Sequence, residues 1–194
     1  MIKHWLAEIG KLTLIKKRIA DLDGDKMFPF HLPNPAATEA DIMSVEDFLG
    51  HTLDNNYKQF LKLRNGWRDF FHSSDLFGTI ELKSRQDLDS SSIWVESLVF
   101  KEVGISIEEL LPISISKHTH DVFFMARPFS RNSGKIFWFC EEEIDRYESF
   151  DDYFMAMSTY TFRTMKRLEA GWPQKTLPKG WDKDIYKDFQ LWRP

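Results

Sequence analysis

Apolar residues recur at helical spacing over residues 2–19 and form a single stripe. The stripe consists of Ile2, Trp5, Leu6, Ile9, Leu12, Ile15 and Ile19. This spacing predicts an amphipathic helix whose lysines and Arg18 lie on the solvated side. An anionic membrane is the alternative partner for that basic side. Prolines and a glycine over residues 21–35 then predict an irregular connection, so we expect residues 1–35 to be an N-terminal helix and its connection.

Two further helices are indicated by their start and stop signals. Thr38, with Asp41 three residues later, forms a capping-box pattern ahead of an apolar stripe that runs to Leu49. Gly50 ends this helix. A third helix is expected over residues 54–65, because apolar residues fall on one side of it and Asn65-Gly66 favours a left-handed stop.

Several segments alternate with a period near two, which is the pattern of half-buried strands. They cover residues 76–82, 111–115, 122–126 and 135–140. A polar turn at residues 131–134 joins the last two into a hairpin. Residues 86–104 favour a helix, and a long last helix is expected between Ser149 and Gly171. The tail over residues 171–194 is expected to be an ordered coil.

The order of these elements predicts an α+β fold in which a mainly antiparallel sheet packs against helices. Hydrophobic residues make up 42% of the chain and charged residues 29%, enough for both a core and a solvated surface. Single cores commonly extend to about 100–200 residues. We therefore expect one main domain over residues 36–170, preceded by the segment 1–35 and followed by the tail 171–194.

Charge and cysteine usage narrow the class of protein. The net charge is −4, which gives no electrostatic reason to expect binding to nucleic acid. No apolar run approaches the roughly 20 residues that span a bilayer, and the first residues lack the pattern of a signal peptide. The single cysteine, Cys140, excludes an internal disulfide. We therefore expect a cytoplasmic protein without membrane or nucleic-acid partners.

Two groups of residues could carry chemistry, and both have a simpler interpretation. His118, His120 and Asp121 are legitimate metal ligands, but a polar turn between strands is the favoured interpretation. Cys140 could act as a nucleophile, yet three glutamates follow it and disfavour a thiolate, so a small buried residue is favoured. We expect no metal, no cofactor and no enzyme activity.

Four motifs in order resemble those of the SUKH superfamily, the Smi/Knr type of domain. The first is the run over residues 37–66, with its acidic helix, Leu49-Gly50, a Tyr-Lys-x-Phe-Leu helix and the Asn-Gly stop. The others are Leu76-Phe77-Gly78, Leu111-Pro112-Ile113 and Ser149-Phe150-Asp151-Asp152-Tyr153-Phe154. The resemblance covers about residues 37–160. The chain departs from the family pattern at Asp54, where proline is usual, and at His120, where Gly-Asp is common.

The resemblance implies a function in protein binding. Members of this superfamily bind and neutralise polymorphic toxins, often nucleases, in the cell that produces them, whereas fungal relatives act as scaffolds in cell-wall signalling. Neither role requires catalysis. The resemblance therefore implies an immunity protein whose partner is a cognate toxin, and the alternative is a regulatory scaffold that binds an endogenous protein.

Two surfaces are candidates for the partner. The first is acidic and combines Glu81 and Asp121 with the run Glu141, Glu142 and Glu143. Clustered carboxylates can imitate phosphate and accelerate binding to a basic cleft, although a solvated edge is the alternative interpretation. The second is aromatic and consists of Trp67, Phe70 and Phe71. Large aromatics are enriched at interfaces, but core packing is favoured for at least two of these three.

Overall fold

The chain folds into two compact units in the computed structural model, which describes residues 2, 4–84, 104–140, 142–177 and 179–192. One unit is formed by residues 31–153, and the other by residues 2–30 together with the C-terminal segment from residue 154. The helix expected over residues 86–104 lies, apart from Gly104, outside the described residues. The domain limits expected at residues 36 and 170 stay a prediction.

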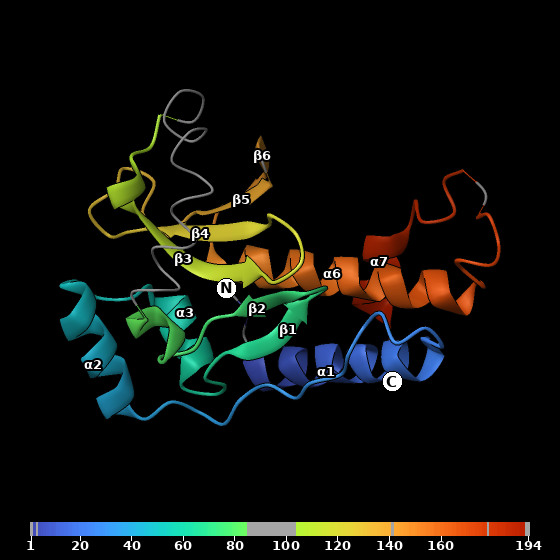
Figure 1. The fold of residues 1–194 in the computed structure, drawn as a ribbon, viewed down its shortest axis with the longest axis horizontal. Helices are drawn as coiled ribbons and strands as arrows, with labels where there is room; N and C mark the ends of the chain where they lie inside the picture. Colours follow the sequence, from blue (N-terminus) through green and yellow to red (C-terminus); the bar gives the residue numbers. More distant parts are fainter. Residues whose placement is uncertain (1, 3, 85–103, 141, 178, 193–194) are drawn as a thin grey trace. The chain divides into compact units, whose positions relative to one another are not determined.

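The unit of residues 31–153 is built on a six-stranded antiparallel sheet in which consecutive strands are neighbours (Figure 1). Its strands are β1 Trp67–Phe71, β2 Ser74–Leu76, β3 Leu110–Ser116, β4 Val122–Ala126, β5 Ile136–Cys140 and β6 Glu142–Tyr147. The last three expected strands are confirmed as β3, β4 and β5, and β4 and β5 form the expected hairpin. The sheet and its helices confirm the α+β class.

The strand expected over residues 76–82 is wrong beyond its first residue. Only Leu76 belongs to a strand, after which the chain forms the short 3-10 helix η1, Glu81–Lys83. The Leu82 N–H donates to the Gly78 carbonyl at 3.1 Å, and the Gly78 N–H donates to the Glu81 carboxylate at 2.9 Å. These bonds close a helical turn, so the apolar alternation here reflects the burial of Leu82 and not a strand ladder.

Strand β4 lies at the centre of the core, and all five of its residues are buried. One face of the sheet carries the cluster Ile105, Leu110, Val122, Phe124, Ala126, Phe137 and Phe139. On the opposite face Phe123 packs on Trp138 and Tyr153, with ring centroids 5.1 Å apart in each pair. A strand that is buried on both faces has a continuous apolar sequence, which explains the run Val122–Ala126.

Helix α2, Glu39–Leu49, begins and ends where its sequence signals place it. The Thr38 hydroxyl accepts from the Asp41 N–H at 3.1 Å, and the Asp41 carboxylate accepts from the Thr38 N–H at 2.9 Å. This reciprocal pair satisfies two backbone donors that the first turn leaves without an intrahelical partner. Gly50 ends the helix in the left-handed conformation, with φ +71°.

Loss of this cap should weaken the fold in a pH-dependent way. We expect Thr38→Ala to lower the free energy of unfolding by about 1 kcal/mol at neutral pH. Hydrogen bonds from Thr38 lower the pKa of the Asp41 carboxyl in the folded state. The stability from this carboxylate is thus present above its unfolded pKa, about 4, and is lost as the pH falls through the lower folded value.

Urea denaturation of the variant and the parent at neutral pH and near pH 3 measures this effect. The difference between the two proteins should shrink on acidification, because the parent then loses the bonds to the ionised carboxylate as well. A difference that is the same at both pH values would show that Asp41 does not contribute through its charge.

Helix α3, Asn55–Leu61, starts at an aspartate in the position where the resembled family usually has proline. The Asp54 carboxylate accepts from the N–H groups of Asn56 and Tyr57, at 2.9 and 3.1 Å. The Tyr57 hydroxyl donates to the Phe77 carbonyl at 2.7 Å. Burial raises the pKa of this phenol well above its ordinary value. A side-chain cap therefore replaces the rigid start that proline gives, and α3 is fixed to the segment after β2.

The Asn65-Gly66 stop packs backbone against backbone on Gly78. A Cβ atom at Gly66, whose φ is +85°, would lie 2.6 Å from the Gly78 nitrogen, and one at Gly78 would lie 2.4 Å from the Asn65 carbonyl oxygen. The Asn65 amide holds the contact, because it donates to the Thr79 hydroxyl at 2.9 Å and accepts from the Thr79 N–H at 2.7 Å. Two of the sequence motifs thus meet at one close contact, where only glycine fits.

The long last helix is confirmed as α6, Phe150–Glu169. Ser149 caps it, since its hydroxyl accepts from the Asp152 N–H at 3.2 Å. Phe150 is fully buried and packs on Tyr57 and Phe60 of α3, with ring centroids 4.8 and 5.6 Å apart. The start of α6 therefore belongs to the same aromatic core as α3 and the sheet.

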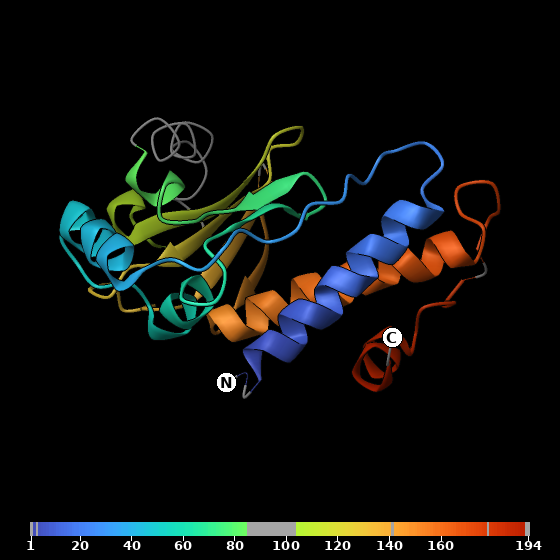
Figure 2. The ribbon, with the colours of Figure 1, turned by 90° about the horizontal axis from the view of Figure 1, so that it is seen from below.

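The second unit consists of three helical segments. Figure 2 shows helix α1, Trp5–Leu22, beside the part of α6 that follows Tyr153. Their shared core contains Ile15, Ile19, Phe162, Met165 and Phe189. Phe189 lies in α7, Ile185–Leu191, so the coil expected for the tail is wrong over these residues. The cause is the burial of Phe189, which is 1% exposed and packs on Phe162 at 5.8 Å.

The basic side of α1 is partly occupied within this unit. The Lys11 ammonium lies 3.8 Å from the centre of the Phe189 ring and donates to the Phe189 carbonyl. Lys16 is buried, and Arg18 pairs with Glu169 at 3.4 Å. Among the described residues, no helix is long and apolar enough to cross a membrane.

Candidate functional site

Three connections lie at one end of the sheet, which we call the turn end. They are residues 72–73 between β1 and β2, residues 117–121 between β3 and β4, and the junction at which Cys140 of β5 pairs with Glu142 of β6. The register aligns them, because Ser74 pairs with Ser116 and the Ser116 N–H donates to the Asp121 carbonyl at 2.8 Å. Next across the sheet, Val122 pairs with Phe139. Asp121 and Glu142, distant in sequence, are therefore brought to the same end.

Asp121 is held in place by a tryptophan that sequence reasoning missed as a site residue. The Trp138 indole N–H donates to the Asp121 carboxylate at 2.6 Å, and the Thr119 hydroxyl donates to the same carboxylate. Trp138 is half-buried, stacks on Phe123 and meets the Phe71 ring edge-on at 5.7 Å. It lies in an apolar run typical of a buried strand, so its sequence carries no signal of a role at the surface.

The aromatic candidates form part of the core. Trp67 and Phe70 are both 0% exposed, and Phe71 is 7% exposed. The Trp67 indole N–H donates to the His31 carbonyl at 2.8 Å, and the Phe70 ring packs on Tyr153 at 6.0 Å. Their burial supports the core interpretation, while Phe71 reaches the turn end through its contact with Trp138.

The acidic candidates separate into two places. Glu81 lies in η1, beyond the opposite end of β2, where it accepts from the Gly78 N–H. Glu142 and Glu143 lie in β6 and so join Asp121 near the turn end. Glu141 lies outside the described residues. The structure thus places three of the five acidic candidates at the same end of the sheet.

Strand β6 carries an excess of negative charge. Glu143 pairs with Arg146 through two hydrogen bonds, at 2.6 and 2.8 Å, and raises the pKa of the arginine. The Arg146 guanidinium also lies 5.4 Å from the centre of the Phe137 ring. Glu142 is exposed and forms no ion pair with any described residue, so its charge, like that of Asp145, is not neutralised.

The segment that contains His118 and His120 is an organised polar turn. The Ser116 hydroxyl accepts from the N–H groups of His118 and Thr119, at 3.3 and 3.1 Å. Within the described part of the chain, no group of three or more His, Cys, Asp and Glu side chains is arranged to hold a metal ion. The turn therefore serves to place Asp121 beside Trp138.

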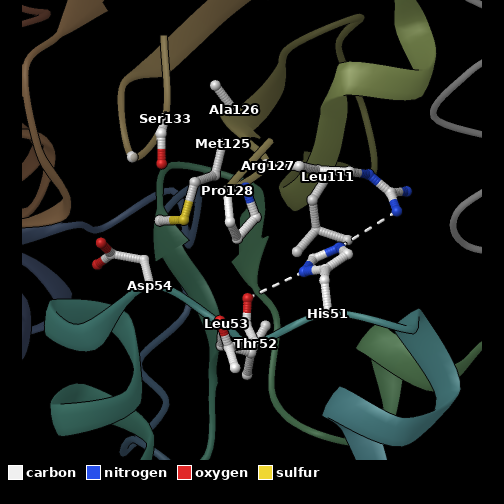
Figure 3. Close-up of a pocket in the computed structure, with 11 residues that line it drawn as sticks. His51, Thr52, Leu53, Asp54, Leu111, Met125, Ala126, Arg127, Pro128 and Ser133 are labelled. Carbon is white, nitrogen blue, oxygen red and sulfur yellow. Dashed lines mark hydrogen bonds between the residues drawn. The ribbon is translucent and has the colours of Figure 1, made fainter. Parts of the chain in front are cut away.

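A small pocket lies beyond the opposite end of β4 and is too small to be a substrate site. Its lining includes His51, Leu53, Asp54, Met125 and Arg127, and its cavity volume is about 30 Å³. Ligand sites commonly have volumes of about 300–1,000 Å³. Figure 3 shows the Arg127 guanidinium turned toward His51 and away from the space beside Met125.

The contacts in this pocket have a structural role. Arg127 donates to the Leu110 carbonyl at 2.9 Å and lies 3.2 Å from Nε2 of His51, whose Nδ1 lies 2.9 Å from the Thr52 carbonyl oxygen (Figure 3). A neutral imidazole with its proton on Nδ1 satisfies both contacts. Burial lowers the pKa of Arg127. The arginine thus fixes the loop between α2 and α3 to the end of β4.

Comparison with known proteins identifies the family of this fold. A search of curated proteins finds no match. The model of the SMI1 / KNR4 family (SUKH-1) matches residues 36–156, a span that contains α2, α3, all six strands and the start of α6. The matched span is more than half of the chain and includes the turn end of the sheet. The chain therefore belongs to the SMI1 / KNR4 family (SUKH-1).

Proposed function

We propose that this chain is a non-catalytic immunity protein that binds and neutralises a cognate bacterial toxin in the cytoplasm of the cell that produces both. Its family is generally non-catalytic, and SUKH domains generally bind protein partners such as toxins. The single cysteine suits a reducing compartment. The proposal assigns binding to the turn end and the adjoining strand β6.

The observation that carries this assignment is the placement of carboxylates from separate segments at one end of the sheet. Asp121 is positioned by Trp138, and Glu142 and Glu143 follow across β5 and β6. Carboxylates gathered in this way complement a basic cleft, such as one that binds the phosphates of a nucleic acid. A nuclease toxin is therefore the partner that this surface fits best.

Co-expression with the toxin encoded beside this chain is the direct test of the function. Growth should be rescued, and the two proteins should co-purify as a stoichiometric complex. The toxin in this complex should be inactive but chemically unchanged. Glu142→Lys should slow association by about tenfold, and the loss should shrink at high salt, because steering by exposed charges is screened. The measurement is the association rate at several salt concentrations.

A matched control is available on the surface of α2. Asp47 is an exposed carboxylate with no ion pair to any described residue, so Asp47→Lys makes the same charge change away from the turn end. It should leave the association rate nearly unchanged. Failure to rescue growth, combined with capture of an endogenous housekeeping protein, would replace the proposal by the regulatory scaffold role.

A further inference from the structure

We propose that the outer edge of β6 accepts an extended, lysine- or arginine-bearing segment of the partner as a seventh strand of the sheet. This inference rests on the proposed function, since it assigns the manner in which the protein partner is bound. Three features of the sheet support it: the accessibility of the two edge strands, the negative charge of β6 and the bulge in the pairing of β6 with β5.

Strand β6 is the last strand of the sheet and pairs only with β5 among the described residues. An edge strand presents a row of backbone N–H and C=O groups that an extended chain can complete. The Arg146 N–H donates to the Asp145 carboxylate at 2.8 Å, and no other backbone group of residues 142–146 is bonded to a described residue outside the ladder with β5. The remaining outward main-chain groups of residues 142–146 are thus available for another strand.

At the opposite edge of the sheet, residues 31–34 lie beside the start of β1. Beside the start of β1, the Asn34 N–H donates to the Gly66 carbonyl at 3.0 Å, and the Trp67 indole donates to the His31 carbonyl at 2.8 Å. His31 also pairs with Asp69 at 2.8 Å. The segment of residues 31–34 therefore hinders access to the start of β1, which leaves β6 as the more accessible edge of the described sheet.

The charge of β6 selects the kind of strand that can pair with it. The strand carries three carboxylates and one guanidinium, and Arg146 is already paired with Glu143. A second copy of this chain would place one row of carboxylates beside another, and like charges on facing strands are destabilising. A basic segment would instead pair with Glu142 and Asp145, so the partner strand must bring lysine or arginine.

The pairing of β5 with β6 is irregular in a way that favours one specific partner. Trp138 pairs with Asp145 and Phe139 with Glu143, so Ile144 is the extra residue of a bulge and is 46% exposed. Two features of an edge strand block indiscriminate pairing. A bulge twists the strand away from a regular partner, and charged side chains disfavour the approach of an apolar strand. The carboxylates of β6 do not disfavour a basic strand. A basic strand that also fits the bulge can pack on the exposed Ile144 side chain.

Binding of short peptides to the full chain tests this inference without any toxin. The probe is a capped peptide of about eight residues in which lysine and valine alternate. It should bind and shift backbone amide NMR signals of β6 and β5, whereas a peptide with glutamate in place of lysine should not. A lysine-proline peptide has the same charge but cannot form the ladder, and it should bind about tenfold more weakly.

Variants of the chain complete the test. Glu142→Lys combined with Asp145→Lys should reduce binding of the lysine-valine peptide by about tenfold or more, while Asp47→Lys should not. Equal binding of the lysine-proline peptide, or shifts confined to other elements, would overturn the inference. If the toxin still co-purifies in that case, the proposed function stands and only the edge-pairing mode fails.

Discussion

Gly66→Ala should be among the most damaging single substitutions in the sheet-containing unit. Its φ of +85° is unfavourable for alanine, at a cost of about 1–2 kcal/mol. The added Cβ would also lie 2.6 Å from the Gly78 nitrogen and 2.9 Å from the Leu76 carbonyl oxygen. These are backbone atoms that cannot rotate away, so overpacking adds about 1–3 kcal/mol. The free energy of unfolding should fall by about 2–5 kcal/mol.

Gly50→Ala separates the two contributions. Gly50 also has a positive φ, +71°, but a Cβ there would meet nothing within 4 Å. This variant should lose only the conformational part, about 1–2 kcal/mol. Urea denaturation of both variants measures the difference, which reports the contact between Gly66 and Gly78. Equal losses in the two variants would show that this backbone contact relaxes without cost.

Phe150→Ala should destabilise the protein by about 3–5 kcal/mol, because it leaves a cavity in the aromatic core. Phe150 is 0% exposed and contacts Tyr57 and Phe60 of α3 as well as Tyr153 of its own helix. The loss should appear both in urea denaturation and in the near-ultraviolet circular dichroism of the neighbouring tyrosines.

Phe129→Ala is the matched control for this truncation. The Phe129 side chain is 65% exposed, so its removal creates no cavity and should change the free energy of unfolding by no more than about 0.5 kcal/mol. A loss from Phe150→Ala that is as small as this would mean that the start of α6 is not part of the core that supports α3.

Features determined by neighbouring residues were predictable from the sequence. The capping box of Thr38 and Asp41 and the left-handed stop at Gly50 need only residues within one helix, and both are present. The apolar runs of β3, β4 and β5 were also predictable, because strands with two buried faces cannot alternate with polar residues.

The three remaining strands lacked such local signals. Strand β2 has only three residues, and β1 contains Asp69 at φ +49°, a left-handed position that interrupts the period of a strand. The acidic run before Tyr147 indicated a charged surface, but only the ladder with β5 shows that it is a strand at the edge of a sheet. Sequence therefore indicated the charge of this segment and not its conformation.

The contacts that build the candidate surface depend on register and could not be predicted. The bond between Trp138 and Asp121 joins residues 17 positions apart, and it exists because β5 returns antiparallel beside β4. The approach of Gly66 to Gly78 likewise requires a long-range fold. Such contacts follow from strand pairing, which neither periodicity nor composition determines.

The position of residues 31–34 beside β1 limits how the sheet can be extended. Open-ended growth of a sheet from copy to copy requires two free edges on each molecule, one to receive a strand and one to offer. Here the Asn34 N–H donates to the Gly66 carbonyl and the His31 carbonyl accepts from the Trp67 indole, so residues 31–34 hinder the addition of a strand beside the start of β1. If the partner binds through β6 as proposed, we therefore expect a complex that closes after one addition, with one-to-one stoichiometry and without growth into a fibre.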